Sequence, residues 1–310
     1  MKKEKKVASI SLDLDNQWSY MKIHGDEGWD LYPSYLDIFV PHVLDILDEL
    51  EIKITFFIVG KDCESELNRR YIKMIVDRGH EVGNHSYYHE SWLQTYSYEK
   101  IEKEIISAEN AIQEVTGQKP RGFRGPGFSW SFDLLKVLEK RGYLYDASTL
   151  PTYLGPLARL YYFSKSGLSK EEKNARKELF GKFSEGFRKL KPYYFELGDG
   201  RKIKEIPVTT MPIFKLPFHF SYLLFLSNVS LLLMKLYLNI AIFLCKLTGT
   251  PISFLLHPLD IIGGDQIKQL AFFPGMNIQS ERKVKVFKEV IIQLKKHYRL
   301  TNMSEYCSKF

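Results

Sequence analysis

The chain has 310 residues, of which 45% are hydrophobic, and a formal net charge of +7. That size fits one large domain or two small ones, and the hydrophobic content is ordinary for a globular protein. Three widely separated cysteines without a C-x-x-C spacing exclude a disulfide framework and a cysteine zinc site. The start, MKKEKKVASIS, is basic but lacks the apolar run of a signal peptide, so we expect a cytoplasmic location.

Residues 1–150 alternate predicted strands with predicted helices. The strands are expected at 7–13, 54–59, 81–84, 122–124 and 144–146, and the helices at 35–50, 64–78, 98–116 and 132–141. This order is typical of a parallel sheet or barrel with right-handed crossovers. In the first strand, apolar side chains alternate with small polar side chains and aspartates. The apolar face is predicted to meet the helices, and the polar face to point into a β/α barrel.

A basic insertion interrupts this order after Pro151, over residues 155–200, and is predicted to be helical. Residues 159–191 contain ten Lys or Arg and four Asp or Glu, a net charge of +6. Such a patch indicates an anionic partner, or else a solvated helix face. The chain contains no recognisable nucleic-acid-binding motif, so nucleic acid is not an expected partner.

A second, apolar insertion is predicted to be helical over residues 212–249, after a strand expected at 202–210. Its residues 216–234 carry no formal charge and are long enough to cross a membrane. Ser227 and Asn228 are predicted to start a second helix that ends at Gly249. Polar residues near one face leave three alternatives: a helix on a membrane surface, a helix packed on the protein, or a span.

The β/α pattern resumes after the insertions with an expected strand at 251–257, a helix at 280–297 and a short strand at 298–303. We therefore predict a single domain over residues 1–310 that carries the two insertions.

The residues with metal chemistry directly follow predicted strands. Asp13 and Asp15 end the first strand, and His85 and His89 follow the third, where one helical turn would place both rings on the same side. The carboxyl ends of barrel strands meet on one face. Two histidines and one carboxylate suit zinc, cobalt or non-haem iron, which leaves the second carboxylate free to act as a base.

Two further residues have the same placement. Arg124 follows the fourth strand, and Pro126 and Gly127 are expected to shape the turn after it. An arginine in this position can pair with a carboxylate and orient it. His257 ends a late strand, where it could donate a proton to a leaving group.

Together, these motifs resemble those of the NodB-type polysaccharide deacetylases, carbohydrate esterase family 4. The resemblance rests on DLD at 13–15, H-x3-H at 85–89, RGP at 124–126 and LLH at 255–257. It implies an α/β fold, a distorted (β/α)7 barrel, and a divalent metal, usually Zn²⁺, with Co²⁺, Fe²⁺, Ni²⁺ or Mn²⁺ as alternatives. The implied reaction is hydrolysis of an N-acyl group from an amino sugar.

Residue roles follow from the resemblance. The implied metal ligands are Asp15, His85 and His89, and the implied catalytic residues are Asp13 (base), Arg124 (its partner), His257 (acid) and Asp146 (tuning the acid). Glu205 competes with Asp146 for the last role. The first motif departs from the family pattern, in which the two aspartates are adjacent; here Leu14 separates them.

The substrate prediction follows from the two insertions. Their organisation, with EIPVTTMP before the apolar stretch, is similar to that of the deformylases of lipid-linked aminoarabinose. We therefore expect an N-deacetylase or deformylase acting on a lipid-linked (polyprenyl phosphate) or nucleotide-linked amino sugar. An anionic membrane surface on the cytoplasmic side is the expected partner. The alternatives are hydrolysis of a small soluble amide or cyclic imide, and an inactive carbohydrate-binding protein, although binding alone would need neither Asp13 nor His257.

Overall fold

A parallel sheet forms the centre of the molecule in the computed structural model, which describes residues 5–157, 160 and 183–310. Its strands lie in the order β10-β1-β2-β3-β4-β5-β7-β6, and β11 also pairs with β1. Their bounds are β1 Val7–Leu14, β2 Thr55–Ile58, β3 Glu81–Asn84, β4 Gly122–Phe123, β5 Tyr145–Asp146, β6 Tyr193–Gly198, β7 Arg201–Glu205, β10 Ile252–Leu256 and β11 Arg299–Thr301. All pairs in this sheet are parallel except β6 with β7.

The segment after β7 bridges the two sides of the sheet. The Val208 N–H donates to the Thr149 carbonyl, and the Thr209 N–H donates to the Ser253 carbonyl in β10. A further short pair, β8 Thr210–Met211 with β9 Leu216–Pro217, follows directly. The strands therefore curve into an irregular barrel, which confirms the predicted distorted (β/α)7 fold.

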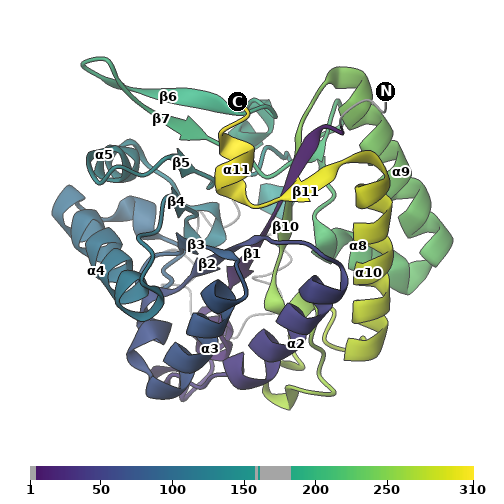
Figure 1. Ribbon diagram of the computed structural model, residues 1–310, viewed down its shortest axis with the longest axis horizontal. Helices are drawn as coiled ribbons and strands as arrows, with labels where there is room; N and C mark the ends of the chain where they lie inside the picture. Colours follow the sequence, from purple (N-terminus) through teal and green to yellow (C-terminus); the bar gives the residue numbers. More distant parts are fainter. Residues whose placement is uncertain (1–4, 158–159, 161–182) are drawn as a thin grey trace.

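Helices surround this barrel (Figure 1). In that view α3, α4 and α5 lie on the left or below, and α8, α9 and α10 form a layer on the right. The helix bounds are α1 Gln17–His24, α2 Leu36–Glu49, α3 Glu66–Asp77, α4 Tyr98–Thr116, α5 Phe132–Lys140, α8 Phe220–Val229, α9 Leu231–Thr248, α10 Ser280–His297 and α11 Met303–Cys307. Most follow the amphipathic rule: α4, for example, buries Ile101, Ile105 and Ile112 at helical spacing.

The insertions differ in part from their prediction. Most of the basic insertion lies outside the described residues, and its end is not helical, because residues 193–198 form β6. There Phe195 and Leu197 are buried between exposed neighbours, the period-two pattern of a strand. The apolar insertion is helical as expected, but its second helix begins after Ser230, whose side chain accepts from the Leu233 N–H, rather than at Ser227 and Asn228. That helix ends at Gly249, as predicted.

Candidate metal centre and catalytic site

The carboxyl ends of β1, β3, β4 and β10 meet on one face of the barrel. Six of the seven catalytic and metal residues proposed from the sequence lie in contact there. These are Asp13, Asp15, His85, His89, Arg124 and His257.

Asp15, His85 and His89 form a compact buried set whose potential ligand atoms all lie within 4.8 Å of one another. The Asp15 Oδ1 atom is 3.2 Å from His85 Nε2 and 2.8 Å from His89 Nε2. Burial acts to raise the pKa of Asp15, but His89 and His85 outweigh it and hold that pKa well below its usual value.

The orientation of His85 is the test of whether this set fits a metal. Its Nδ1 lies 2.6 Å from the Arg124 carbonyl, which can only accept a hydrogen bond, so Nδ1 is the donor. In a neutral ring the lone pair is then on Nε2 and faces the Asp15 oxygen at 3.2 Å, so the two atoms repel each other unless the ring takes up a proton or a cation lies between them. A lone pair facing a carboxylate in a buried site is an arrangement that a divalent cation satisfies, and backbone-oriented histidines are typical of metal ligands. The residues therefore fit a metal.

The two histidines converge by a route that differs from the sequence prediction. Residues 85–89 do not form a helical turn: Ser86 and His89 have the positive φ angles of the left-handed region, 63° and 51°. A left-handed backbone conformation costs free energy in residues other than glycine, and hydrogen bonds stabilise it here. The Ser86 Oγ accepts from the His89 N–H, and the Glu104 carboxylate of α4 accepts from the N–H groups of Tyr87 (3.0 Å) and Tyr88 (2.6 Å). Glu104 is thus a supporting residue that sequence reasoning missed.

A buried carboxyl at Asp62 fixes the turn that follows Asp15. Its Oδ1 accepts from the Asn16 side chain (2.7 Å) and the Trp18 indole (2.8 Å), while Tyr35 donates its hydroxyl to the Asp15 carbonyl. Burial raises the pKa of Asp62 to about 7. The Asn-x-Trp that follows Asp15 therefore anchors the strand end that carries Asp15.

Asp13 and Arg124 form a buried ion pair beside the metal set. The Arg124 Nη1 atom donates to Asp13 Oδ1 at 2.7 Å and to the Ser11 hydroxyl at 2.8 Å, and Nε donates to the Ala147 carbonyl. Gly125 makes the turn after it, where a Cβ atom would lie 1.9 Å from the Ser129 carbonyl oxygen. The pair leaves Asp13 Oδ2 facing His257.

His257 lies across from Asp13, with 4.0 Å between Nε2 and Asp13 Oδ2. Its Nδ1 is 3.7 Å from the carboxylate of Asp260, which also accepts from the His257 backbone N–H. Burial acts to lower the pKa of His257, but Asp260, followed by Asp13 and Asp15, raises it to about 9. The ring is thus positively charged at neutral pH. Asp260, in the HPLD sequence, is a second residue that sequence reasoning missed.

Asp146 does not lie beside the His257 ring. Among the described residues, the carboxylates within 4.0 Å of the His257 ring are Asp260 and Asp13, so neither Asp146 nor Glu205 contacts it. Asp146 instead accepts from Ser148, whose hydroxyl accepts from the N–H of Gly125. Burial and the neighbouring Asp146 charge raise the pKa of Glu205 well above its usual value. Asp146 therefore supports the Arg124 turn.

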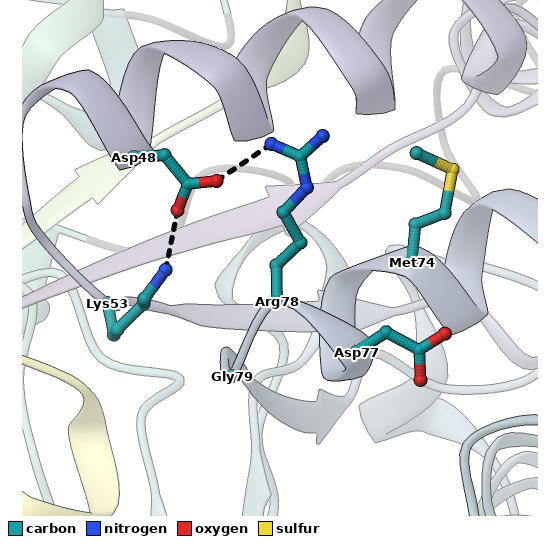
Figure 2. Close-up of a pocket in the computed structure, with 6 residues that line it drawn as sticks. All are labelled: Asp48, Lys53, Met74, Asp77, Arg78 and Gly79. Carbon is teal, nitrogen blue, oxygen red and sulfur yellow. Dashed lines mark hydrogen bonds and ion pairs between the residues drawn. The ribbon is translucent and has the colours of Figure 1, made fainter.

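A hollow of about 660 Å³ lies away from this site, between α2 and α3 (Figure 2). Its charges are satisfied internally, because Asp48 pairs with both Lys53 (2.6 Å) and Arg78 (2.7 Å). It contains none of the residues described above, so we do not regard it as the functional site.

The sequence model described as polysaccharide deacetylase matches residues 25–145. Those residues include His85, His89 and Arg124; Asp13, Asp15 and His257 lie outside them. The peptidoglycan deacetylase of Helicobacter pylori is 30% identical over 149 residues, 46% of this chain and 48% of that protein. The peptidoglycan deacetylase-like protein FGM2 of Gibberella zeae is 37% identical over 128 residues, 40% of this chain and 35% of that protein. The chain thus matches only about a third to a half of these relatives' lengths.

A solved structure matches the whole chain. A putative polysaccharide deacetylase from Mycobacterium smegmatis superimposes with a TM-score of 0.61 and 20% identity, covering 100% of this chain and 91% of that chain. At this identity the match concerns the fold, and it agrees with the barrel described above.

Proposed function

We propose that the chain is a member of the polysaccharide deacetylase family, whose sequence model matches residues 25–145, and that it is a metal-dependent hydrolase that removes an N-acyl group, acetyl or formyl, from an amino sugar. One observation carries this proposal. A buried Asp-His-His set lies beside a carboxylate, Asp13, and an imidazole, His257, that face each other at 4.0 Å. That is a base and an acid on either side of one reaction centre.

Asp15, His85 and His89 would hold the metal, most simply Zn²⁺, which when bound polarises the acyl carbonyl and makes water a better nucleophile. Asp13, oriented by Arg124, takes a proton from the attacking water. His257, charged and oriented by Asp260, gives a proton to the departing nitrogen. The products are a short carboxylic acid and an amino sugar.

The test combines metal analysis with mass spectrometry. Purified protein, loaded with Zn²⁺, is incubated with N-acetyl and N-formyl amino sugars in free, nucleotide-linked and polyprenyl-phosphate-linked form. We expect one bound metal per chain and loss of the acyl mass from at least one sugar. Hydrolysis only of a small soluble amide, or only of a cyclic imide, which gains the mass of one water, would favour that alternative when both are added to the panel. Folded, metal-loaded protein that leaves every compound intact would contradict the proposal.

The finer part of the proposal is that the sugar is lipid-linked and that the enzyme lies on the cytoplasmic membrane surface. Support comes from an apolar ridge on α8 and α9, six residues that are each more than half exposed: Phe225, Val229, Leu232, Leu236, Phe243 and Leu247. By length and composition alone, α9 could also cross a membrane, and 28% of its most apolar window is buried.

Two polar side chains of α9 lie at the exposed edge of its contact with α10. Lys235 pairs with Glu289 of α10 (2.8 Å), and Asn239 accepts from Gln293 of the same helix (2.6 Å). The helix buries one apolar face, which includes Met234, Leu238 and Cys245, and it also presents apolar side chains outward, where a helix on a water-soluble core would carry polar ones. An exposed apolar face of this kind is typical of a helix that lies in a membrane interface.

A basic hollow continues the ridge at the end of α9. Its volume is about 410 Å³, and its lining includes five cationic side chains: Lys5, Lys6, Lys246, Arg299 and Lys309. Arg299 is paired with Glu305. Cations next to an apolar face suit anionic headgroups, each worth about 1 kcal/mol near the surface.

Co-sedimentation with phosphatidylglycerol vesicles tests the membrane part. Phe243→Glu is expected to reduce vesicle binding about 10- to 100-fold, because the variant loses the free energy gained by burying one aromatic side chain in the membrane. Leu67→Glu on α3, a residue that is 53% exposed away from the ridge, is the matched control and should bind normally. Equal binding by both variants would contradict the membrane surface while leaving the deacylase proposal intact.

A further inference from the structure

A fourth histidine, His219, lies beside the Asp13 and His257 pair. It directly precedes α8 and is 7% exposed. Its ring is 6.2 Å from the ring of His257 between centroids, at 66°, and packs edge-on against Tyr222. The nearby charges that act on it are His257, Asp260, Asp13 and Arg124, the acid and base side of the site.

The Nδ1 atom of His219 is buried and has no hydrogen-bond partner in the part of the chain that the structure describes. The side chain also makes no capping hydrogen bond to α8, although it occupies the capping position. Packing against Tyr222 needs only a ring, which phenylalanine would supply without burying an unsatisfied polar atom. A structural role therefore explains the ring of His219 but not its buried, unpartnered Nδ1 atom.

His219 is neutral, unlike its neighbour. Burial and the positive charge of His257 lower the pKa of His219 to about 3. A neutral imidazole offers one hydrogen-bond donor and one acceptor. Such a group suits an uncharged polar partner, such as a hydroxyl, better than an ion.

We propose that His219 is a substrate-contacting residue that hydrogen-bonds the sugar hydroxyl on the carbon next to the acylamino-bearing carbon. This inference rests on the proposed function, in which His257 faces the departing nitrogen. The polar group next to that nitrogen on a sugar ring is the neighbouring hydroxyl, and His219 is the unpartnered polar side chain next to His257. The apolar insertion would then contribute to sugar recognition as well as to membrane binding, because α8 begins directly after His219.

The test compares two substrates with three proteins. The probes are the methyl glycoside of N-acetylglucosamine and its 3-deoxy analogue, and the readout is kcat/KM by mass spectrometry. His219→Phe keeps the ring and removes the nitrogens, and we expect it to lower kcat/KM about 10- to 100-fold on the hydroxylated sugar but little on the deoxy sugar. His219→Asn, which restores a polar atom near the Nδ1 position, should recover part of the loss.

His80 provides a matched control, because it is also buried and has an unpartnered ring nitrogen, Nε2, but packs against Phe56 in β2 away from the site. His80→Phe should leave the ratio between the two sugars unchanged. Equal losses on both sugars with His219→Phe, or no loss, would overturn the inference while the deacylase function stands. If the wild-type protein deacylates neither these sugars nor any of the panel above, the proposed function fails and the role of His219 fails with it.

Discussion

The two sides of the site are built differently. On the metal side, Asp15 and His85 directly follow strands β1 and β3, and a hydrogen bond to a backbone carbonyl holds each position: Tyr35 donates to the Asp15 carbonyl, and His85 donates to the Arg124 carbonyl. On the acid side, His257 is oriented by a side chain three residues away, Asp260, and borders His219 from an inserted helix. The barrel therefore fixes the metal side, whereas local turns and an insertion shape the acid side.

This difference predicts how each side responds to substitution. A change on the metal side removes a group from a dense buried network, so it should affect both chemistry and folding. A change on the acid side should affect the pH dependence and the substrate preference more than the fold. The following predictions test this contrast.

The largest effect is expected from removing a metal ligand. His89→Ala should abolish stoichiometric metal binding and lower kcat at least about 10³-fold, because metal activation is worth several kcal/mol. Metal content by mass spectrometry and kcat would be measured together. His42→Ala on α2, away from the site, is the control and should retain both metal and activity.

Asp13→Asn tests whether the proposed base also stabilises the folded protein. We expect kcat to fall about 10²- to 10⁴-fold at normal metal content. Stability to urea should also drop by about 3–5 kcal/mol, because Arg124 would keep a buried charge without its partner.

The double variant Asp13→Asn/Arg124→Met should regain most of the lost stability but none of the activity. Recovery of activity, or an Asp13→Asn protein with undiminished kcat, would contradict the role of Asp13.

Asp260→Asn tests the acid side. In the folded protein the pKa of His257 is raised from 6.5 to about 9, so its stabilising charge is fully present below 6.5 and is lost as the pH rises through 9. Without Asp260 the pKa of His257 falls, and the alkaline limb of kcat/KM should move to lower pH. We expect a loss of about 10-fold at pH 8 and a smaller one at pH 6. A pH profile parallel to that of the wild type would contradict the pairing.

The smallest effect is expected for Glu205→Gln. The pKa of Glu205 is raised in the folded protein, so the wild type loses stability as the pH rises above the unfolded value of 4.5. Glutamine keeps the oxygen that accepts from Thr149 and cannot ionise. We expect stability within about 1 kcal/mol of the wild type at pH 5 and higher than the wild type at pH 8. Lower stability at pH 8, measured by urea unfolding, would show that the ionised carboxylate is required.

The contrast between the two sides also explains which residues were predictable. Asp13, Asp15 and His85 could be proposed as site residues because they end or directly follow strands with a clear apolar pattern, and Arg124 and His257 because they follow later strands. The resemblance implied that Asp146 tunes His257, whereas in the structure Asp146 accepts from Ser148, whose hydroxyl accepts from the N–H of Gly125 in the turn after Arg124.

The supporting residues gave weaker signals. Glu104 lies within a helix, and Asp62 in a short turn, so neither is marked by a strand end. In the sequence, His219 lies among apolar residues, a pattern that indicates a lipid-facing or core segment rather than a site. Asp260 had the best available signal, a carboxylate three residues after a predicted catalytic histidine with a proline between them.

The sequence by itself determined the alternation of strands and helices, and with it the convergence of the metal set, because strand periodicity and strand ends are local properties. Only the tertiary structure decided which charges meet. The pairing of Asp13 with Arg124 joins residues 111 positions apart, and His219 reaches His257 only because α8 packs against β10. Contacts of this kind depend on how helices and turns pack around the barrel, which no local pattern encodes.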